Sequence, residues 1–290
     1  MTAVDSHPRR GAALVIVLLF AALITMLAAT AARSGLSAAS ASAAFVDLMR
    51  ADELARAAAD LVAVAASTGG PSARRGGSFV AHLETAELSV DYISETARID
   101  INAAPPALLG QLFAAAAAEP GLATDIAERV ERARRSSQAS PDSQRRPGAA
   151  SPPASSIVLE RLEQIVEAWN IPNELYRAAR PALTVGSRSA KVDPTLASRL
   201  VILAMMNADQ ERTDEFMERR MRGFTSADEA LAQFPETSRT FAGFGPPRAY
   251  RASIQVSIGR RFQRHYEVVV APPGGNQRAA QIISWQPVLR

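Results

Sequence analysis

The sequence predicts an α+β protein in which a long N-terminal transmembrane helix leads into an antiparallel sheet that is interrupted by a large helical insertion. Three observations predict this class. The chain begins with a long uncharged run, strand-like alternation appears both before and after a central region, and that region has helical spacing of its apolar residues. Strands on both sides of a helical block indicate one shared sheet, because an isolated two-stranded hairpin is rarely stable.

The composition limits the chemistry. With 290 residues, of which 48% are hydrophobic, the chain can form one large domain or two modest ones. It contains no cysteine, which excludes disulfides, thiolate zinc sites and thiol nucleophiles. The formal net charge is only +3 and the arginines are spread along the chain, so no nucleic-acid partner is predicted. Three histidines (His7, His82, His265) offer little for a triad, and no enzymatic activity is predicted.

The uncharged run predicts a transmembrane helix over residues 12–33. No charged residue occurs from Gly11 to Ala32, and about 22 residues at 1.5 Å each span a hydrocarbon core of about 30 Å. Arg9 and Arg10 stand directly before the run, and positive charge there keeps the N-terminus in the cytoplasm. The alternative is a secretory signal peptide cut near residues 29–32, whose apolar core is usually about 7 to 15 residues.

Apolar residues continue at helical spacing beyond this run. No proline interrupts the pattern before Pro71, so the helix is expected to run from Ala12 to about Ala66, with residues 34–68 forming an extension outside the membrane. Ser67 to Pro71 has the composition of a turn and is expected to end the helix.

Six segments alternate apolar and polar residues or gather β-branched ones, and they predict the strands. These segments are Phe79–Leu83, Glu87–Ile93, Arg98–Ile101, Tyr250–Ile258, Phe262–Val270 and Gln281–Trp285. The sheet domain is therefore expected to comprise residues 77–101 and 248–290, with a helical insertion over 102–247.

Within the insertion, Asn102 is expected to cap the first helix, and Glu119 to Leu122 to form a turn. Residues 136–156 are rich in Ser, Pro, Arg and Gln and predict a flexible, solvated loop.

The stretch from Arg9 to Leu19 resembles the leader of a type IV pilin. The resemblance implies a leader peptide of residues 1–11 that prepilin peptidase cuts after Gly11, with methylation of the new N-terminal Ala12. Most pilin-like subunits carry glutamate at the fifth mature position, which is Ile16 here. The K-type minor pseudopilin of type II secretion, general secretion pathway protein K, typically lacks this glutamate, and an unpaired carboxylate in lipid would be costly.

Internal segments extend the resemblance to nearly the whole chain. The segments similar to K-type pseudopilins are residues 94–104, 192–198, 250–253 and 282–285. The resemblance implies a single-pass inner-membrane protein with a periplasmic C-terminal domain at the tip of a pseudopilus. The implied partners are other minor pseudopilins, the major pseudopilin, prepilin peptidase and inner-membrane lipid. Ile16, Ser34, Ala38 and Ala41 are the expected helix-packing positions, and the small residues Ser34, Ala38 and Ala41 would permit close approach.

Two other functions remain open from the sequence. One is a membrane-tethered periplasmic enzyme or binding protein, whose N-terminal helix is only an anchor. The other is a minor pilin of a type IV pilus.

Four groups of residues have both a functional and a structural interpretation. Residues 102–135 have the outline of a helix-hairpin-helix, but of its Gly-x-Gly turn only Gly121 is present, so packing is favoured. Glu160, Glu163 and Glu167 are expected on one helix face, paired with Arg161 or water. Tyr92, Tyr250 and Trp285 are expected in the sheet core. The fourth set offers oxygen ligands for calcium, which the resemblance permits without assigning ligands: Asp91, Glu95, Asp100, Asp193, Asp209, Glu211, Asp214 and Glu215.

Overall fold

The computed structural model describes residues 8–70, 72–116, 119–138, 159–260, 262–273 and 279–288. The chain divides into two compact units, Met1–Leu54 and Ala55–Arg290. The predicted loop of residues 136–156 lies outside the described residues from position 139 onward.

The N-terminal helix α1 covers Pro8–Thr68. It begins four residues before the predicted start at Ala12, because proline suits the first helical turn, where its missing N–H costs no hydrogen bond. It ends at Thr68, two residues beyond the expected Ala66. At the following Gly69, the N–H donates to the Ala65 carbonyl at 2.9 Å, and a Cβ would lie only 2.4 Å from that same oxygen. Glycine is therefore required where the helix ends.

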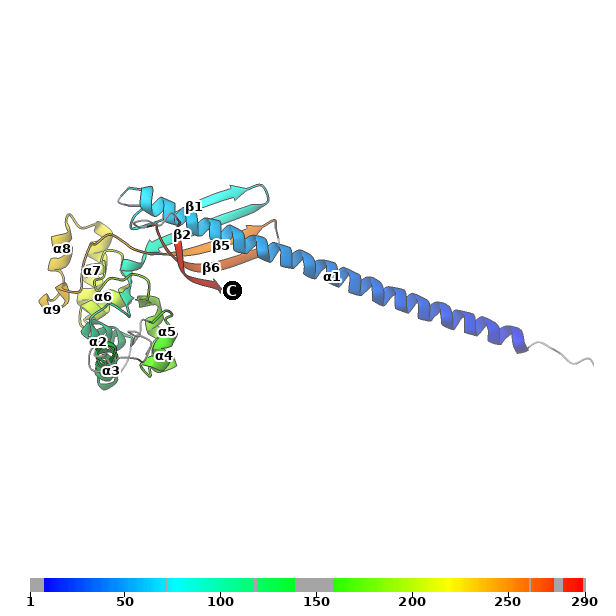
Figure 1. Cartoon of the computed structure of the whole chain (residues 1–290), viewed down its shortest axis with the longest axis horizontal. Helices are drawn as coiled ribbons and strands as arrows, with labels where there is room; N and C mark the ends of the chain where they lie inside the picture. The colour runs from blue at the N-terminus through cyan, green and yellow to red at the C-terminus, as the bar shows by residue number, and fades with distance from the viewer. Residues whose placement is uncertain are drawn as a thin grey trace, which may run out of the picture. The chain divides into compact units, whose positions relative to one another are not determined.

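Five antiparallel strands form the main sheet of the second unit, in the order β1-β2-β5-β6-β7. Figure 1 shows β1, β2, β5 and β6 side by side. Segments from before and after the helical region thus share one sheet, as predicted, and the α+β class is confirmed. The strands are β1 Gly76–Leu83, β2 Ala86–Ser94, β5 Tyr250–Ile258, β6 Phe262–Ala271 and β7 Gln281–Val288.

The two faces of this sheet differ in polarity. On β2 and β5 every second side chain is buried, including Leu88, Val90, Ile254 and Val256. The same unit contains the end of α1, whose Ala55, Ala58, Ala59, Val62, Ala63 and Ala66 are also buried. Figure 1 shows this end of α1 running across the strands. On β2 and β5 the opposite face carries the alternate residues, which are mostly polar, as expected when one face packs and the other is more exposed.

The predicted third strand, Arg98–Ile101, does not join the main sheet. Only Ile99–Asp100 (β3) is a strand, and it pairs in parallel with Leu183–Thr184 (β4) in a separate two-stranded sheet. The prediction of a third strand in the main sheet was wrong. The partner of so short a strand depends on how the chain folds back more than 80 residues later, which local alternation does not encode.

The region between β3 and β5 is mainly helical, as predicted, and Figure 1 shows its helices gathered in a group of their own. The helices are α2 Pro106–Ala115, α3 Pro120–Gln138, α4 Gln164–Ala168, α5 Asn173–Ala179, α6 Arg199–Met205, α7 Gln210–Arg222, α8 Ala227–Ala232 and α9 Glu236–Arg239. Short 3-10 turns occur at Glu95–Ala97 and Arg180–Ala182. Ser198, Asp209 and Ser226 cap α6, α7 and α8 through their side-chain oxygens.

Two local expectations for the insertion were wrong. Pro105, not Asn102, precedes α2; the Asn102 side chain instead exchanges two 2.9 Å hydrogen bonds with the backbone of Leu159. Residues 120–122 are not a turn but the first turn of α3, because a proline at the start of a helix is well placed there. The insertion has its own apolar core, in which Phe113, Ile126 and Phe216 are fully buried.

Candidate functional site

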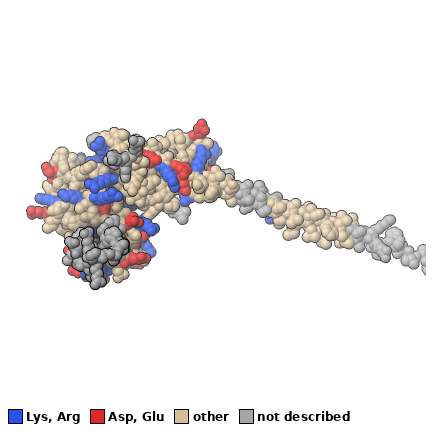
Figure 2. Space-filling view, viewed as in Figure 1, with Lys and Arg blue, Asp and Glu red and all other residues tan. Residues whose placement is uncertain are grey.

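The first unit presents an apolar surface without charge. Leu14–Ala31 has a mean hydropathy of 2.7, none of this window is buried, and by length and composition it could cross a membrane. Figure 2 shows this stretch without blue or red side chains. In water, apolar side chains exposed along a whole helix would be unfavourable, so the segment requires an apolar environment.

The predicted leader and packing residues all lie on α1. Arg9, Arg10, Gly11 and Ala12 fall in its first turns, and their side chains lie outside the described part, as do those of Ser34 and Ala38. The side chain of Ile16 is 53% exposed, and Ala41 is also exposed. Their roles in cleavage, topology and helix packing stay predictions.

The second unit buries charge at the junction between the main sheet and the helical insertion. Glu95 follows β2 directly and is 0% exposed. Its carboxylate accepts hydrogen bonds from Arg98 Nη1 at 3.1 Å, from Arg251 Nε at 2.8 Å, and from the Thr184 hydroxyl. A carboxylate removed from water needs this many partners, because unpaired it would be very costly.

The two arginines share Glu95 unequally. Arg251 engages both oxygens of Glu95 and also donates from Nη1 to Glu267 at 2.8 Å. Arg98 has only one bond to Glu95, and its Nε donates to the Pro181 carbonyl at 3.1 Å. Desolvation by burial is the largest influence on both guanidinium groups. For Arg98 it prevails and lowers the pKa, whereas for Arg251 the nearby carboxylates together outweigh it and raise the pKa.

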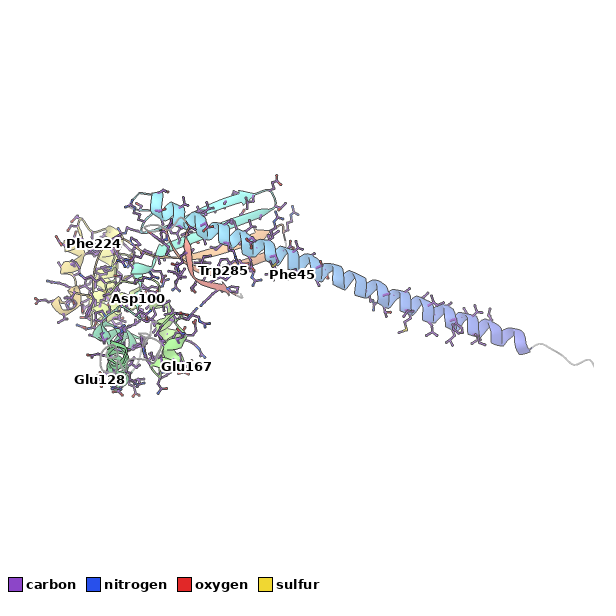
Figure 3. The ribbon with its side chains drawn as sticks, viewed as in Figure 1. Phe45, Asp100, Glu128, Glu167, Phe224 and Trp285 are labelled. Carbon is purple, nitrogen blue, oxygen red and sulfur yellow. The ribbon has the colours of Figure 1, made fainter. Side chains whose placement is uncertain are left out.

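Asp100 on β3 is a second buried carboxylate, only 1% exposed. Figure 3 shows it between the helices and the main sheet. It accepts hydrogen bonds from Asn102 N–H at 2.9 Å, Arg188 N–H at 2.7 Å and the Ser187 hydroxyl at 3.0 Å. Burial nevertheless raises the pKa of Asp100, since desolvation outweighs these bonds.

Backbone and side-chain hydrogen bonds add further links across the junction. The Glu95 N–H donates to the Ala249 carbonyl at 2.9 Å, and the Asp193 N–H to the Thr96 carbonyl at 2.8 Å. Arg180 Nη2 donates to Gln286 Oε1 on β7 at 2.8 Å. The insertion is therefore attached both to the 3-10 turn after β2 and to β7.

The glutamates predicted on one helix face are not so arranged. Only Glu167 lies within α4, while Glu160 and Glu163 precede it, because α4 has only five residues. All three are exposed, and Glu163 accepts a 3.3 Å bond from the Tyr176 hydroxyl.

The predicted aromatic residues and the two helices of the helix-hairpin-helix outline contribute to packing. Tyr92 and Tyr250 are buried with their rings edge to face at 6.0 Å. Trp285 is half-buried, 5.2 Å from the Tyr266 ring and 5.7 Å from the Arg56 guanidinium. Helices α2 and α3 contact each other as the outline predicted.

The described acidic residues do not gather into a metal-binding cluster. Within the described part of the chain, no three His, Cys, Asp or Glu side chains gather closely enough to hold a metal. Glu95 and Asp100 point their lone pairs at N–H and O–H donors, and Asp193 and Asp209 accept bonds within their own turns. The expectation of calcium therefore stays a prediction from the resemblance alone.

Sequence reasoning missed the roles of Arg251, Glu267 and Arg98 and assigned Glu95 only as a calcium candidate. Arg251 and Glu267 are charged residues inside predicted strands, which was a usable signal. Charged residues inside predicted strands need partners, and the antiparallel register of β5 and β6 brings these two to the same face.

These features are those of a pilin-like α+β fold with an apolar N-terminal helix. No protein-family model and no curated protein matches the sequence. The fold is similar to that of a solved structure, one chain of the GspK–GspI–GspJ complex from the type 2 secretion system of enterotoxigenic Escherichia coli. That chain and this one share 12% sequence identity with a TM-score of 0.60, covering 84% of this chain and 98% of the other. The comparison confirms the resemblance to this group of proteins at the level of the fold.

Proposed function

We propose that the protein is a minor pseudopilin of a type II secretion system, which caps or initiates the periplasmic pseudopilus for protein export across the outer membrane. The observation that carries this proposal is the similarity in fold, over 84% of the chain, to a subunit of a complex of three secretion-system proteins. The exposed, uncharged helix at the N-terminus supports it, because a pseudopilin needs a helix that is stable in lipid and against other apolar helices.

In this proposal the protein is made with its N-terminus in the cytoplasm and is anchored in the inner membrane by residues 12–33. Prepilin peptidase removes residues 1–11 after Gly11 and methylates Ala12. The second unit then lies in the periplasm. Ile16 at the fifth mature position suits a subunit at the tip, since no subunit above it would neutralise a glutamate in lipid.

The partners are other minor pseudopilins and the major pseudopilin. Small residues of α1 at Ser34, Ala38 and Ala41 permit close approach of neighbouring helices. Glu95 pairs with Arg251 on β5 and accepts a hydrogen bond from Thr184 in the insertion, so the subunit would present the insertion as a bulky part of the head at the tip.

Mass spectrometry of the N-terminus and a secretion assay test this proposal. Mass spectrometry of the native protein is expected to find methylated Ala12 as the first residue. Deleting the gene is expected to abolish secretion, and wild-type protein, but not a Gly11→Leu variant, is expected to restore it. A mature N-terminus near residue 32 would contradict the proposal.

The alternatives give different results in the same strains. A membrane-tethered enzyme would keep its activity when expressed without residues 1–36, whereas an assembly subunit would lose function altogether. A type IV minor pilin would give a twitching or adhesion defect with normal secretion.

A further inference from the structure

The polar face of the main sheet contains a cavity of about 400 Å³ next to the junction. Its floor is a row of side chains that the register places directly opposite one another on four strands: Ser78, Asp91, Ser253 and Glu267. Such neighbours have Cβ atoms about 4.5 to 5.5 Å apart. Arg98, directly before β3, and Arg251 on β5 also line it.

The charges around this cavity are not all compensated. Arg251 is paired through three hydrogen bonds with Glu95 and Glu267. Arg98 retains Nη2 without a partner among the described residues, and the Asp91 carboxylate has no ion pair or hydrogen bond within them. One cation and one anion that line the same cavity are therefore each open to a ligand.

Two further lining residues, Ser78 and Ser253, can take part in polar recognition. The hydroxyl groups of Ser78 and Ser253 make no hydrogen bond within the described chain, and each can both donate and accept. The lowered pKa of Arg98 agrees with a guanidinium that burial has deprived of water without full compensation. A carboxylate bound to the Arg98 guanidinium would offset this loss of hydration.

We propose that this cavity receives a segment of a partner subunit that places a carboxylate on Arg98 and a cationic side chain on Asp91. Charge complementarity and the open position of the cavity on a sheet face fit a protein segment better than a small molecule. The inference rests on the proposed function, since it requires that partner subunits exist.

The experiment measures binding of the full-length protein in detergent to the pseudopilins that co-purify with it. Ser253→Phe fills the cavity and is expected to weaken binding about ten-fold or more. Asp91→Lys replaces the unpaired carboxylate with a positively charged group. It is expected to weaken binding by about three- to ten-fold, with greater loss at low salt. Ser257→Phe is the matched control, because Ser257 lies on the same strand and face but outside the cavity lining. It is expected to bind like wild type.

The outcomes separate the two proposals. If wild-type protein binds no pseudopilin at all, the proposed function fails. If wild type binds but Ser253→Phe and Asp91→Lys bind as well as Ser257→Phe does, the cavity proposal alone is overturned. Saturable binding of free glycine or glutamine that Ser253→Phe abolishes, without loss of partner binding, would also overturn it in favour of a small zwitterionic ligand.

Discussion

The apolar segment Leu14–Ala31 and the junction around Glu95 are both unusual, because proteins normally bury apolar side chains and expose charged ones. The first exposes leucine, isoleucine and phenylalanine along a whole helix, whereas the second buries two carboxylates completely. The buried charges find their partners inside the same unit. The exposed apolar side chains of Leu14–Ala31 are not buried within the described structure, and by length and composition this segment could cross a membrane.

The largest expected effect is at the junction. Glu95→Gln removes the charge that Arg98 and Arg251 share and is expected to lower the free energy of unfolding by about 3 to 5 kcal/mol. Urea denaturation of the purified protein measures the loss. Glu87→Gln is the control, because Glu87 is 54% exposed and pairs only with exposed His82, and a change of no more than about 0.5 kcal/mol is expected. Equal losses in both variants would contradict a special role for buried charge.

The second effect concerns the apolar segment. Leu23→Arg places a charge near the middle of the span, where insertion into a membrane costs about 2.5 to 3.5 kcal/mol more for arginine than for a neutral residue. We expect most of the protein to become extractable by alkaline carbonate. Leu61→Arg, also at an exposed position of α1, is the control and should remain in the membrane fraction. Retention of both variants would argue against Leu14–Ala31 as the anchor.

A third prediction uses the pH dependence of stability. Burial raises the pKa of Asp100 above its ordinary value of 3.8, so the folded state binds this proton more tightly than the unfolded state does. The contribution of Asp100 to stability is therefore full below about pH 3.8 and is lost as the pH rises through the folded pKa. Asp100→Asn should remove this part of the dependence of the free energy of unfolding on pH. Unfolding curves of both proteins at several pH values provide the measurement, and parallel curves would show the argument to be wrong.

The smallest effect is expected at Arg98. Arg98→Lys keeps the positive charge but cannot bond both Glu95 and the Pro181 carbonyl with the same geometry. A loss of about 1 kcal/mol in unfolding free energy is expected, measured as above. A loss as large as that of Glu95→Gln would mean that Arg98, rather than Arg251, is the main partner of Glu95.

Several elements were accessible from the sequence because their causes are local. The uncharged run marks the apolar helix by composition alone, and the alternation in Tyr250–Ile258 gave that strand with its observed bounds. The start of α1 and the cap of α2 were missed because more than one residue nearby suits a helix terminus.

The sequence by itself determined which segments are apolar helix, strand or insertion, since composition and periodicity act over a few residues. Only the tertiary structure decided that β3 pairs with β4 and that Glu95 meets Arg251, 156 residues away. It also decided which polar side chains of four strands line one cavity. These contacts depend on how distant segments fold together, and burial, which makes each of them energetically important, exists only once they have done so.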